Sequence, residues 1–194
     1  MYKIKLNIAT TSIKYVRFPD VNHLSLDEFL KLEANYQEPD PHQKEHENIL
    51  EDENNLPNTN KNKILSKQKL INNMERYTLV DCREEKEFLV SHIPNSLLIG
   101  DFEKLIESEE YRKKLPNILI FYCSIGYRSS IFSRKHKNLG SDTRFEVYNL
   151  HGGIFEYANN CHAVVDCKNK LMDKVHGYDQ IWSSMLKPEY VYLD

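Results

Sequence analysis

Cys123 and Arg128 are the residues whose types and spacing most clearly suggest chemistry. Cys123 directly follows the apolar run ILIFY, and Arg128 lies five residues later, where a helix is predicted to begin. In open parallel sheets, binding sites form beyond the carboxyl ends of the strands. The backbone N–H groups between the two residues can curl around the sulfur, and amides at a helix N-terminus attract anions. The pattern therefore predicts a cysteine held as a nucleophilic thiolate.

The loop between these two residues supports this interpretation. Arg128 supplies a permanent positive charge and planar donors, which suit an anionic substrate or the charged terminal sulfur of a persulfide. Gly126 lets the loop bend where a Cβ could clash. A buried core residue is the simpler explanation for an isolated cysteine, but strand, cysteine, loop, arginine and helix together form a specific arrangement.

Strand and helix signals alternate along the chain around this loop. Buried strands are predicted at YTLVDC, SLLIG, ILIFYC and FEVYNL. Helices are predicted at ILSKQKLINNM, EEKEFLV, FEKLIESEEYRKK, residues 128–138 and after HGG. This alternation requires a mostly parallel sheet with helices on both faces.

The N-terminal third of the chain has a different character. Residues 1–19 alternate apolar and polar side chains, which predicts one or two strands, and Ser25 is a predicted N-cap for the helix LDEFLKL. Residues 1–36 are therefore expected to form a strand and helix segment at the N-terminus. Residues 37–62 contain three prolines and few aliphatic residues, so we expect a disordered insertion or linker.

The composition is that of one domain with an extension. The 194 residues are 40% hydrophobic and 28% charged, with a formal net charge of −3. This balance gives no global basic field, so neither nucleic acid nor an anionic membrane is an expected partner. Four cysteines without dense spacing indicate a reducing compartment. A cytoplasmic location is expected, and an organellar transit peptide is the alternative that the N-terminal charge pattern leaves open.

Four segments of the chain occur in a suggestive order: LVDCREEKEF, SHIPNS, IFYCSIGYRSS and VYNLHGGIFEY. In this order they resemble the signature segments of the rhodanese (sulfurtransferase) superfamily. The resemblance implies an α/β fold, a rhodanese-like three-layer domain with a central parallel five-stranded sheet and helices on both faces. We accordingly place the domain at residues 63–188 and expect residues 189–194 to form a C-terminal tail.

The resemblance also implies a reaction. It makes Cys123 the nucleophile that accepts sulfur and Arg128 the charge that closes the loop, and both are expected to be catalytic. Cys123 would attack a sulfane sulfur, as in thiosulfate or a small persulfide, and pass that sulfur to a thiol acceptor without a metal or organic cofactor. The residues expected to bind the substrate are Ser124, Ile125, Gly126, Tyr127 and Ser129.

Loop length and loop charge define the alternatives. Similar protein phosphatases and arsenate reductases have a loop one residue longer, which would place the arginine at position 129, where this chain has Ser129. Family loops often have a second basic residue after the cysteine, but Ser124 is neutral, so we expect weak thiosulfate binding. The rival interpretation is a catalytically weak binding or regulatory module, with residues 37–62 as its partner site.

Several polar residues near these segments are expected to be structural. The resemblance suggests that Asp81 and Arg83 brace the loops by ion pairing. His92 lies in a predicted turn, where a structural role is favoured over a general base. Cys82 is expected to pack in a buried strand, with a resolving disulfide to Cys123 as the alternative.

The C-terminal residues give two further expectations. Cys161 and Cys167 are separated by five residues, which misses the usual spacing of zinc ligands, so no metal site is expected. Ile181, Trp182 and Met185 recur at helical spacing and predict an amphipathic helix that packs on the domain.

Overall fold

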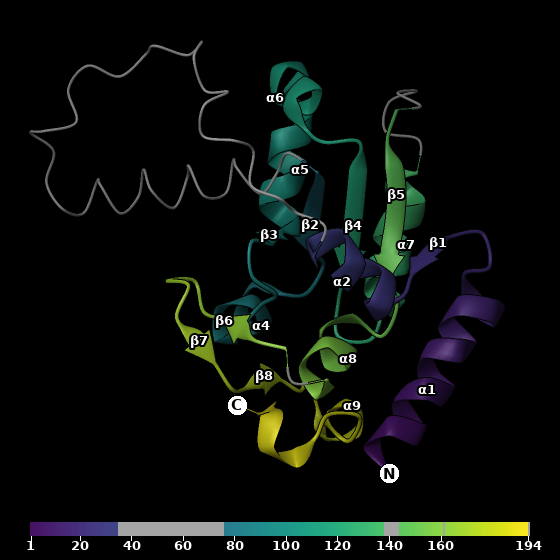
Figure 1. Ribbon diagram of the computed structural model, residues 1–194, viewed down its shortest axis with the longest axis vertical. Helices are drawn as coiled ribbons and strands as arrows, with labels where there is room; N and C mark the ends of the chain where they lie inside the picture. Colours follow the sequence, from purple (N-terminus) through teal and green to yellow (C-terminus); the bar gives the residue numbers. More distant parts are fainter. Residues whose placement is uncertain (35–75, 138–143, 161, 194) are drawn as a thin grey trace, which may run out of the picture.

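A parallel sheet forms the centre of the structure. The computed structural model describes residues 1–34, 76–137, 144–160 and 162–193 (Figure 1). The five strands of the main sheet are all parallel and lie in the order β1-β5-β4-β2-β3. They span Asn22–Leu24 (β1), Tyr77–Asp81 (β2), Leu97–Leu98 (β3), Ile118–Tyr122 (β4) and Glu146–Leu150 (β5). The predicted α/β class and five-stranded parallel sheet are confirmed.

Strand β4 lies in the middle of this sheet, between β2 and β5. Asp81 at the end of β2 is opposite Tyr122 at the end of β4. Phe121 is in turn opposite Asn149 of β5. The residues that follow these strands therefore emerge together at one edge of the sheet, which is where parallel sheets place their sites.

Helices cover both faces of the sheet, because alternate side chains of each strand point to opposite faces. Helices α2 (Leu26–Ala34) and α8 (Gly153–Asn159) pack on one face, and α5 (Ile99–Glu107) and α7 (Tyr127–His136) pack on the other. The first face buries Phe29, Leu79, Ile120, Tyr122, Ile154 and Phe155. The second face buries Val80, Phe102, Leu119, Phe121 and Val147. The domain therefore has three layers, as expected.

The first residues of the chain are helical where strands are predicted. Tyr2–Ser12 form α1, and Ile13–Arg17 continue as a π-helical turn, η1. The strand prediction for residues 1–19 is wrong because Leu6, Thr10 and Ile13 are buried at helical spacing, a periodicity that competes with the alternating pattern.

The next residues join the sheet. Strand β1 pairs with β5, with Asn22 opposite Tyr148. The Ser25 N–H donates to the Glu28 carboxylate at 2.9 Å, and the Glu28 N–H donates to the Ser25 hydroxyl at 3.3 Å. This reciprocal capping box begins α2 and confirms the helix predicted after Ser25. The insertion predicted at residues 37–62 and the helix predicted at 64–74 lie outside the described residues.

Most of the remaining predicted elements are present with shifted ends. Helix α4 spans Glu85–Val90, and the predicted strand SLLIG is reduced to the two residues of β3 before α5 begins. The single helix predicted at residues 102–114 is two helices, α5 and α6 (Glu109–Lys114), because Ser108 between them has an extended backbone. Serine is a weak helix former, which favours a break at this position.

Two pairs of short strands order the C-terminal segment, and a bridge between His92 and Val165 joins that segment to the residues after α4. Strand β6 (Val164–Val165) pairs with β7 (Leu171–Met172), and β8 (Val175–His176) pairs with β9 (Val191–Tyr192). The 3-10 turn η4 spans Pro188–Tyr190. The segment 189–194, expected as a tail, thus contains a strand that is paired with the body of the domain.

The predicted amphipathic helix near the C-terminus is a single turn, α9 (Gln180–Ser183). Trp182 and Met185 pack against the core, but Ile181 is 74% exposed, so its predicted packing is wrong. The Asp179 side chain caps the turn by accepting the N–H groups of Ile181 and Trp182, both at 2.8 Å. No helix in the described ranges is long and apolar enough to cross a membrane.

Candidate active site

Cys123 lies at the carboxyl end of β4, where the chain turns into α7. Its side chain is almost fully buried, and its Sγ accepts a hydrogen bond from the Gly126 N–H at 3.2 Å. Helix α7 begins at Tyr127, so the first N–H groups of that helix, which have no partner within it, follow directly after the loop. The expected loop that curls a backbone N–H toward the sulfur is present.

The other side of this loop is held by the start of α8. The Ile154 N–H donates to the Cys123 carbonyl at 2.9 Å, and the Phe155 N–H donates to the Ser124 carbonyl at 3.0 Å. Gly153 has a φ of +54°, and a Cβ at this position would overlap the Cys123 carbonyl. Only glycine permits this approach, which keeps the loop in the shape that aims Gly126 at the sulfur.

Arg128 closes the loop by binding a buried carboxylate on α4. Its Nη1 and Nη2 donate to the Glu87 carboxylate at 2.6 and 2.8 Å, and Nη2 also donates to the Ser124 hydroxyl at 3.0 Å. Burial raises the pKa of Glu87, but the hydrogen bonds and charge of Arg128 outweigh burial and hold that pKa below its usual value. The two side chains therefore form an ionised pair whose charges cancel.

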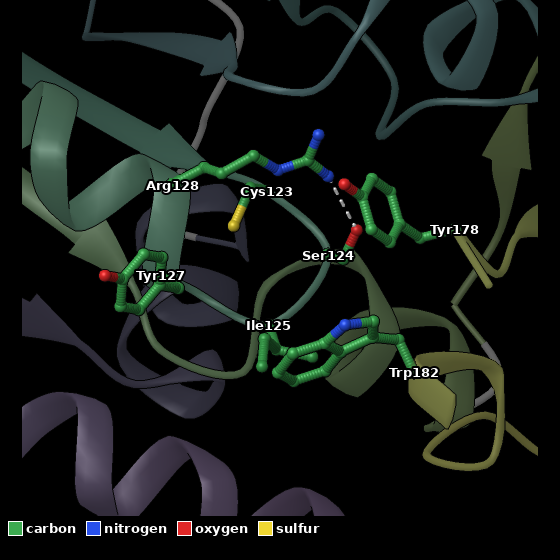
Figure 2. Close-up of a pocket in the computed structure, with 7 residues that line it drawn as sticks. All are labelled: Cys123, Ser124, Ile125, Tyr127, Arg128, Tyr178 and Trp182. Carbon is green, nitrogen blue, oxygen red and sulfur yellow. Dashed lines mark hydrogen bonds between the residues drawn. The ribbon is translucent and has the colours of Figure 1, made fainter. Parts of the chain in front are cut away.

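A cavity of about 360 Å³ opens over the sulfur (Figure 2). The C-terminal segment contributes Tyr178 and Trp182 to its wall, and the ring of Tyr178 lies 5.2 Å from the guanidinium carbon of Arg128. The loop and the first turn of α7 supply the remaining lining residues, Cys123, Ser124, Ile125, Tyr127 and Arg128. The cavity is therefore built by the predicted loop and by a segment far from it in sequence.

Five of the seven residues predicted to act at the site line this cavity, and two do not. Gly126 is placed beneath the sulfur through its backbone N–H, and its φ of +103° needs glycine. Ser129 is fully buried and donates to the Asn149 side chain at 2.5 Å. Ser129 therefore anchors α7 to β5 and faces away from the position predicted for substrate, because successive residues on a helix point in different directions.

Asp81 and Arg83 form the expected ion pair below the site. The Arg83 Nη2 donates to Asp81 at 2.7 Å, and both side chains are 0% exposed. Nη2 also donates to the Ser91 carbonyl at 2.7 Å, which links the end of β2 to the turn after α4. The ion pair that the resemblance suggests is therefore present, and its structural role stays a prediction.

His92 also has the geometry of a structural residue. Its Nδ1 is hydrogen bonded to the Phe88 carbonyl at 3.1 Å, and its ring stacks on Phe88 with centroids 3.8 Å apart. Burial lowers the pKa of His92. The backbone N–H of His92 donates to the Val165 carbonyl at 2.8 Å, so this residue links the end of α4 to β6. His92 does not line the cavity over Cys123.

Cys82 lies beside Cys123 in the core. It follows β2 directly, and its N–H donates to the Tyr122 carbonyl at 2.7 Å. Burial, and secondarily the charge of Cys123, raise the pKa of the Cys82 thiol. Both cysteines are free, so the structure contains packing between them and no disulfide.

Two parts of the site are missing from the sequence prediction. Glu87 sits in the first turn of α4, where an acidic residue is ordinary, and its EEKEF sequence gives no sign that this one is buried. Tyr178 and Trp182 are in a segment predicted only to pack on the domain. The described residues contain no group of three His, Cys, Asp or Glu side chains placed to hold a metal ion, and Cys161 lies outside them.

Comparison with known proteins gives a match to one family model. The model described as rhodanese-like domain matches residues 66–160, which include the Cys123 loop and the segments around Asp81 and Gly153. The comparison with curated proteins gives no match.

Solved structures show weaker likenesses. A rhodanese-related protein from Thermoplasma volcanium is 26% identical, with 50% of this chain and 90% of that chain covered and a TM-score of 0.36. An As-Sb reductase from Leishmania major is 14% identical over 79% of this chain and 92% of that chain, with a TM-score of 0.44. A thiosulfate sulfurtransferase from Pseudomonas aeruginosa is 15% identical over 61% of this chain and 22% of that chain, with a TM-score of 0.38.

Proposed function

The chain contains a rhodanese-like domain, and from this premise we propose that it is a sulfurtransferase or sulfur carrier that holds sulfur as a persulfide on Cys123. One observation carries the proposal: the Sγ of Cys123 accepts the Gly126 N–H at the base of a cavity of about 360 Å³. A donor can enter this cavity, and an added sulfur would lie next to the N–H groups that begin α7.

The reaction divides into two transfers of one sulfur atom. The Cys123 thiolate attacks the outer sulfur of a donor R–S–SH, so that a new S–S bond forms on Cys123 and the donor S–S bond breaks. The leaving thiolate R–S⁻ takes the proton of the transferred sulfur, which leaves Cys123 as the persulfide anion Cys–S–S⁻. An acceptor thiolate then attacks the outer sulfur of the persulfide and returns Cys123 to its thiolate form. No oxidant, metal or organic cofactor is required. The proposed partners are a small sulfane-sulfur donor and a thiol acceptor.

Each loop residue has a role in this scheme. Gly126 supplies the N–H that faces the sulfur, and α8 holds the loop carbonyls away. Arg128 and Glu87 fix the far side of the loop through two charge-assisted hydrogen bonds, which are roughly twice as strong as neutral ones. Arg128 therefore acts mainly by shaping the cradle, because its charge is paired with that of Glu87.

A transfer assay tests the proposal. Sulfur transfer from glutathione persulfide to dithiothreitol should be accelerated by the native protein and by Cys167→Ser, because Cys167 is exposed and does not line the cavity. Cys123→Ser should abolish the acceleration. A Cys123→Ser protein that remains folded and fully active would contradict the proposal.

The same assay separates the rival interpretations. A binding module would show no transfer with any donor, yet would keep the fold. A phosphatase or arsenate reductase would require the longer loop, but Arg128 lies five residues after Cys123. Hydrolysis of p-nitrophenyl phosphate that depends on Cys123, without sulfur transfer, would favour that class.

A further inference from the structure

The C-terminal segment builds a fixed wall over the cradle, outside the residues that match the family model. Tyr178 follows β8, and its N–H donates to the His176 ring at 2.9 Å. Asn159 of α8 holds the residues after α9, because its side chain donates to the Met185 carbonyl and accepts the Lys187 N–H, both at 2.8 Å. The wall residues Tyr178 and Trp182 are therefore positioned by several hydrogen bonds on either side of them.

The cavity inside this wall presents no net positive charge. Apart from the Cys123 thiolate itself, Arg128 is the one of its seven lining residues with a charged side chain. Both of its terminal nitrogens donate to Glu87, which is 0% exposed and held ionised. The ring of Tyr178 lies over the guanidinium, and Ser124 adds no second charge. A doubly charged anion such as thiosulfate therefore gains little electrostatic attraction at this site.

The shape and lining of the cavity suit an organic group. Its volume of about 360 Å³ falls at the lower end of the roughly 300–1,000 Å³ typical of pockets for organic ligands. Ile125, Tyr127 and Trp182 supply apolar surface around the opening, as Figure 2 shows. Aromatic walls bind apolar and aromatic groups because such contacts remove apolar surface from water.

We propose that Tyr178 and Trp182 are specificity-determining residues that select sulfane-sulfur donors with an apolar, preferably aromatic, organic group over inorganic thiosulfate. This inference rests on the proposed function. The sulfur to be transferred would lie at Cys123, and the organic group would lie against the two aromatic rings. The wall would then contribute binding energy that the neutralised Arg128–Glu87 pair does not supply to a small anion.

Two thiosulfonates provide a matched test of this selection. Benzenethiosulfonate and methanethiosulfonate carry the same single charge and the same transferable sulfur, and differ in the aromatic ring. In each case Cys123 takes the outer sulfur and a sulfinate leaves with the electron pair of the broken S–S bond, so atoms and charge balance. The quantity to compare is the ratio of kcat/KM for the phenyl donor to that for the methyl donor.

The native protein should favour the phenyl donor by on the order of tenfold or more, as burial of an aromatic group in an apolar pocket provides. Trp182→Gln should reduce this ratio to near one, and Trp182→Phe should restore most of it. Ile181→Gln is the matched control, because Ile181 is the exposed neighbour that does not line the cavity, and it should leave the ratio unchanged. Tyr178→Ser gives an independent reading if Trp182→Gln does not fold.

Thiosulfate provides the electrostatic half of the test. In the native protein, kcat/KM for thiosulfate should be below kcat/KM for benzenethiosulfonate. In Glu87→Gln, which removes the negative charge that neutralises Arg128, kcat/KM for thiosulfate should rise relative to kcat/KM for methanethiosulfonate. A native phenyl-to-methyl ratio near one, or a ratio that neither Trp182→Gln nor Tyr178→Ser changes, would overturn the inference while sulfur transfer through Cys123 still stands. Failure of every donor to load Cys123 would instead overturn the proposed function.

Discussion

Removal of the Asp81 carboxylate is expected to destabilise the domain strongly. Asp81 accepts the Arg83 Nε and Nη2 at distances of 2.7 to 3.1 Å, and it also accepts the Arg83 backbone N–H at 3.0 Å. Both side chains are 0% exposed. Asp81→Ala therefore leaves a guanidinium charge in the core without its counter-charge, a change that costs about 3–5 kcal/mol. This is a large fraction of the roughly 5–15 kcal/mol that stabilises a typical domain.

Urea unfolding followed by circular dichroism at pH 7 measures this effect. The midpoint of Asp81→Ala should fall sharply, with an unchanged slope. Glu109→Ala is the comparison, because the Lys113–Glu109 pair has a similar distance of 2.8 Å but is 70% and 68% exposed, so its loss should leave the midpoint unchanged. The double change Asp81→Leu with Arg83→Met should recover part of the loss, since it leaves no unpaired charge. An Asp81→Ala midpoint equal to that of the native protein would show that the Arg83 charge does not need Asp81 in the folded core.

Three further predictions concern the loop, the acid range and the thiols. Gly153→Ala should lower the free energy of unfolding by about 1–3 kcal/mol and weaken sulfur loading, because Gly153 has a φ of +54° and an added Cβ would meet the Cys123 carbonyl. Gly100→Ala on the exposed face of α5 should be neutral or slightly stabilising in the same urea titration. Burial lowers the pKa of His151 to about 4, so the folded state holds this ring neutral. The folded state is therefore not penalised by this ring above about pH 6.5, and it loses stability as the pH falls from 6.5 to 4. Unfolding midpoints across that pH range should vary less in His151→Gln than in the native protein. Burial raises the pKa of the Cys82 thiol, so brief treatment of the folded protein with iodoacetamide should leave Cys82 unmodified, and unfolding should make it reactive, as peptide mapping would show. Alkylation of Cys82 at the rate of the exposed Cys167 would contradict its burial.

The loop around Cys123 could be predicted from the sequence because its parts are contiguous. The apolar strand β4, the cysteine, Gly126 and the start of α7 follow one another within a dozen residues, so local periodicity and turn chemistry are enough to identify them. The parallel sheet followed from the alternation of strands and helices. These features depend on short-range sequence signals.

Glu87, Tyr178 and Trp182 could not be predicted because tertiary packing places them. Glu87 has the sequence signature of an exposed acid in the first turn of a helix, and only the packing of α4 against α7 buries it beside Arg128. Tyr178 and Trp182 reach the cavity because Asn159 and the pairing of β8 with β9 fix the C-terminal segment. No local pattern in either segment encodes these contacts.

The N-terminal helix shows where periodicity itself is ambiguous. Residues 1–19 fit both a period of two and a helical period, and the burial of Leu6, Thr10 and Ile13 decides for the helix. Ser129 shows the same limit inside the predicted site. Its place in the sequence suggests the cradle, but its position on α7 turns it toward Asn149.

The most direct test of sulfur transfer through Cys123 is to locate the sulfur on the protein after a single turnover. Native protein and Cys123→Ser are each mixed with a stoichiometric amount of benzenethiosulfonate, alkylated and digested, and the peptides are weighed. Sulfur transfer through Cys123 predicts an added mass of about 32 Da, one sulfur atom, on the Cys123 peptide of the native protein, and its loss after addition of dithiothreitol. A sulfur adduct found only on Cys167, or on no peptide at all, would contradict it.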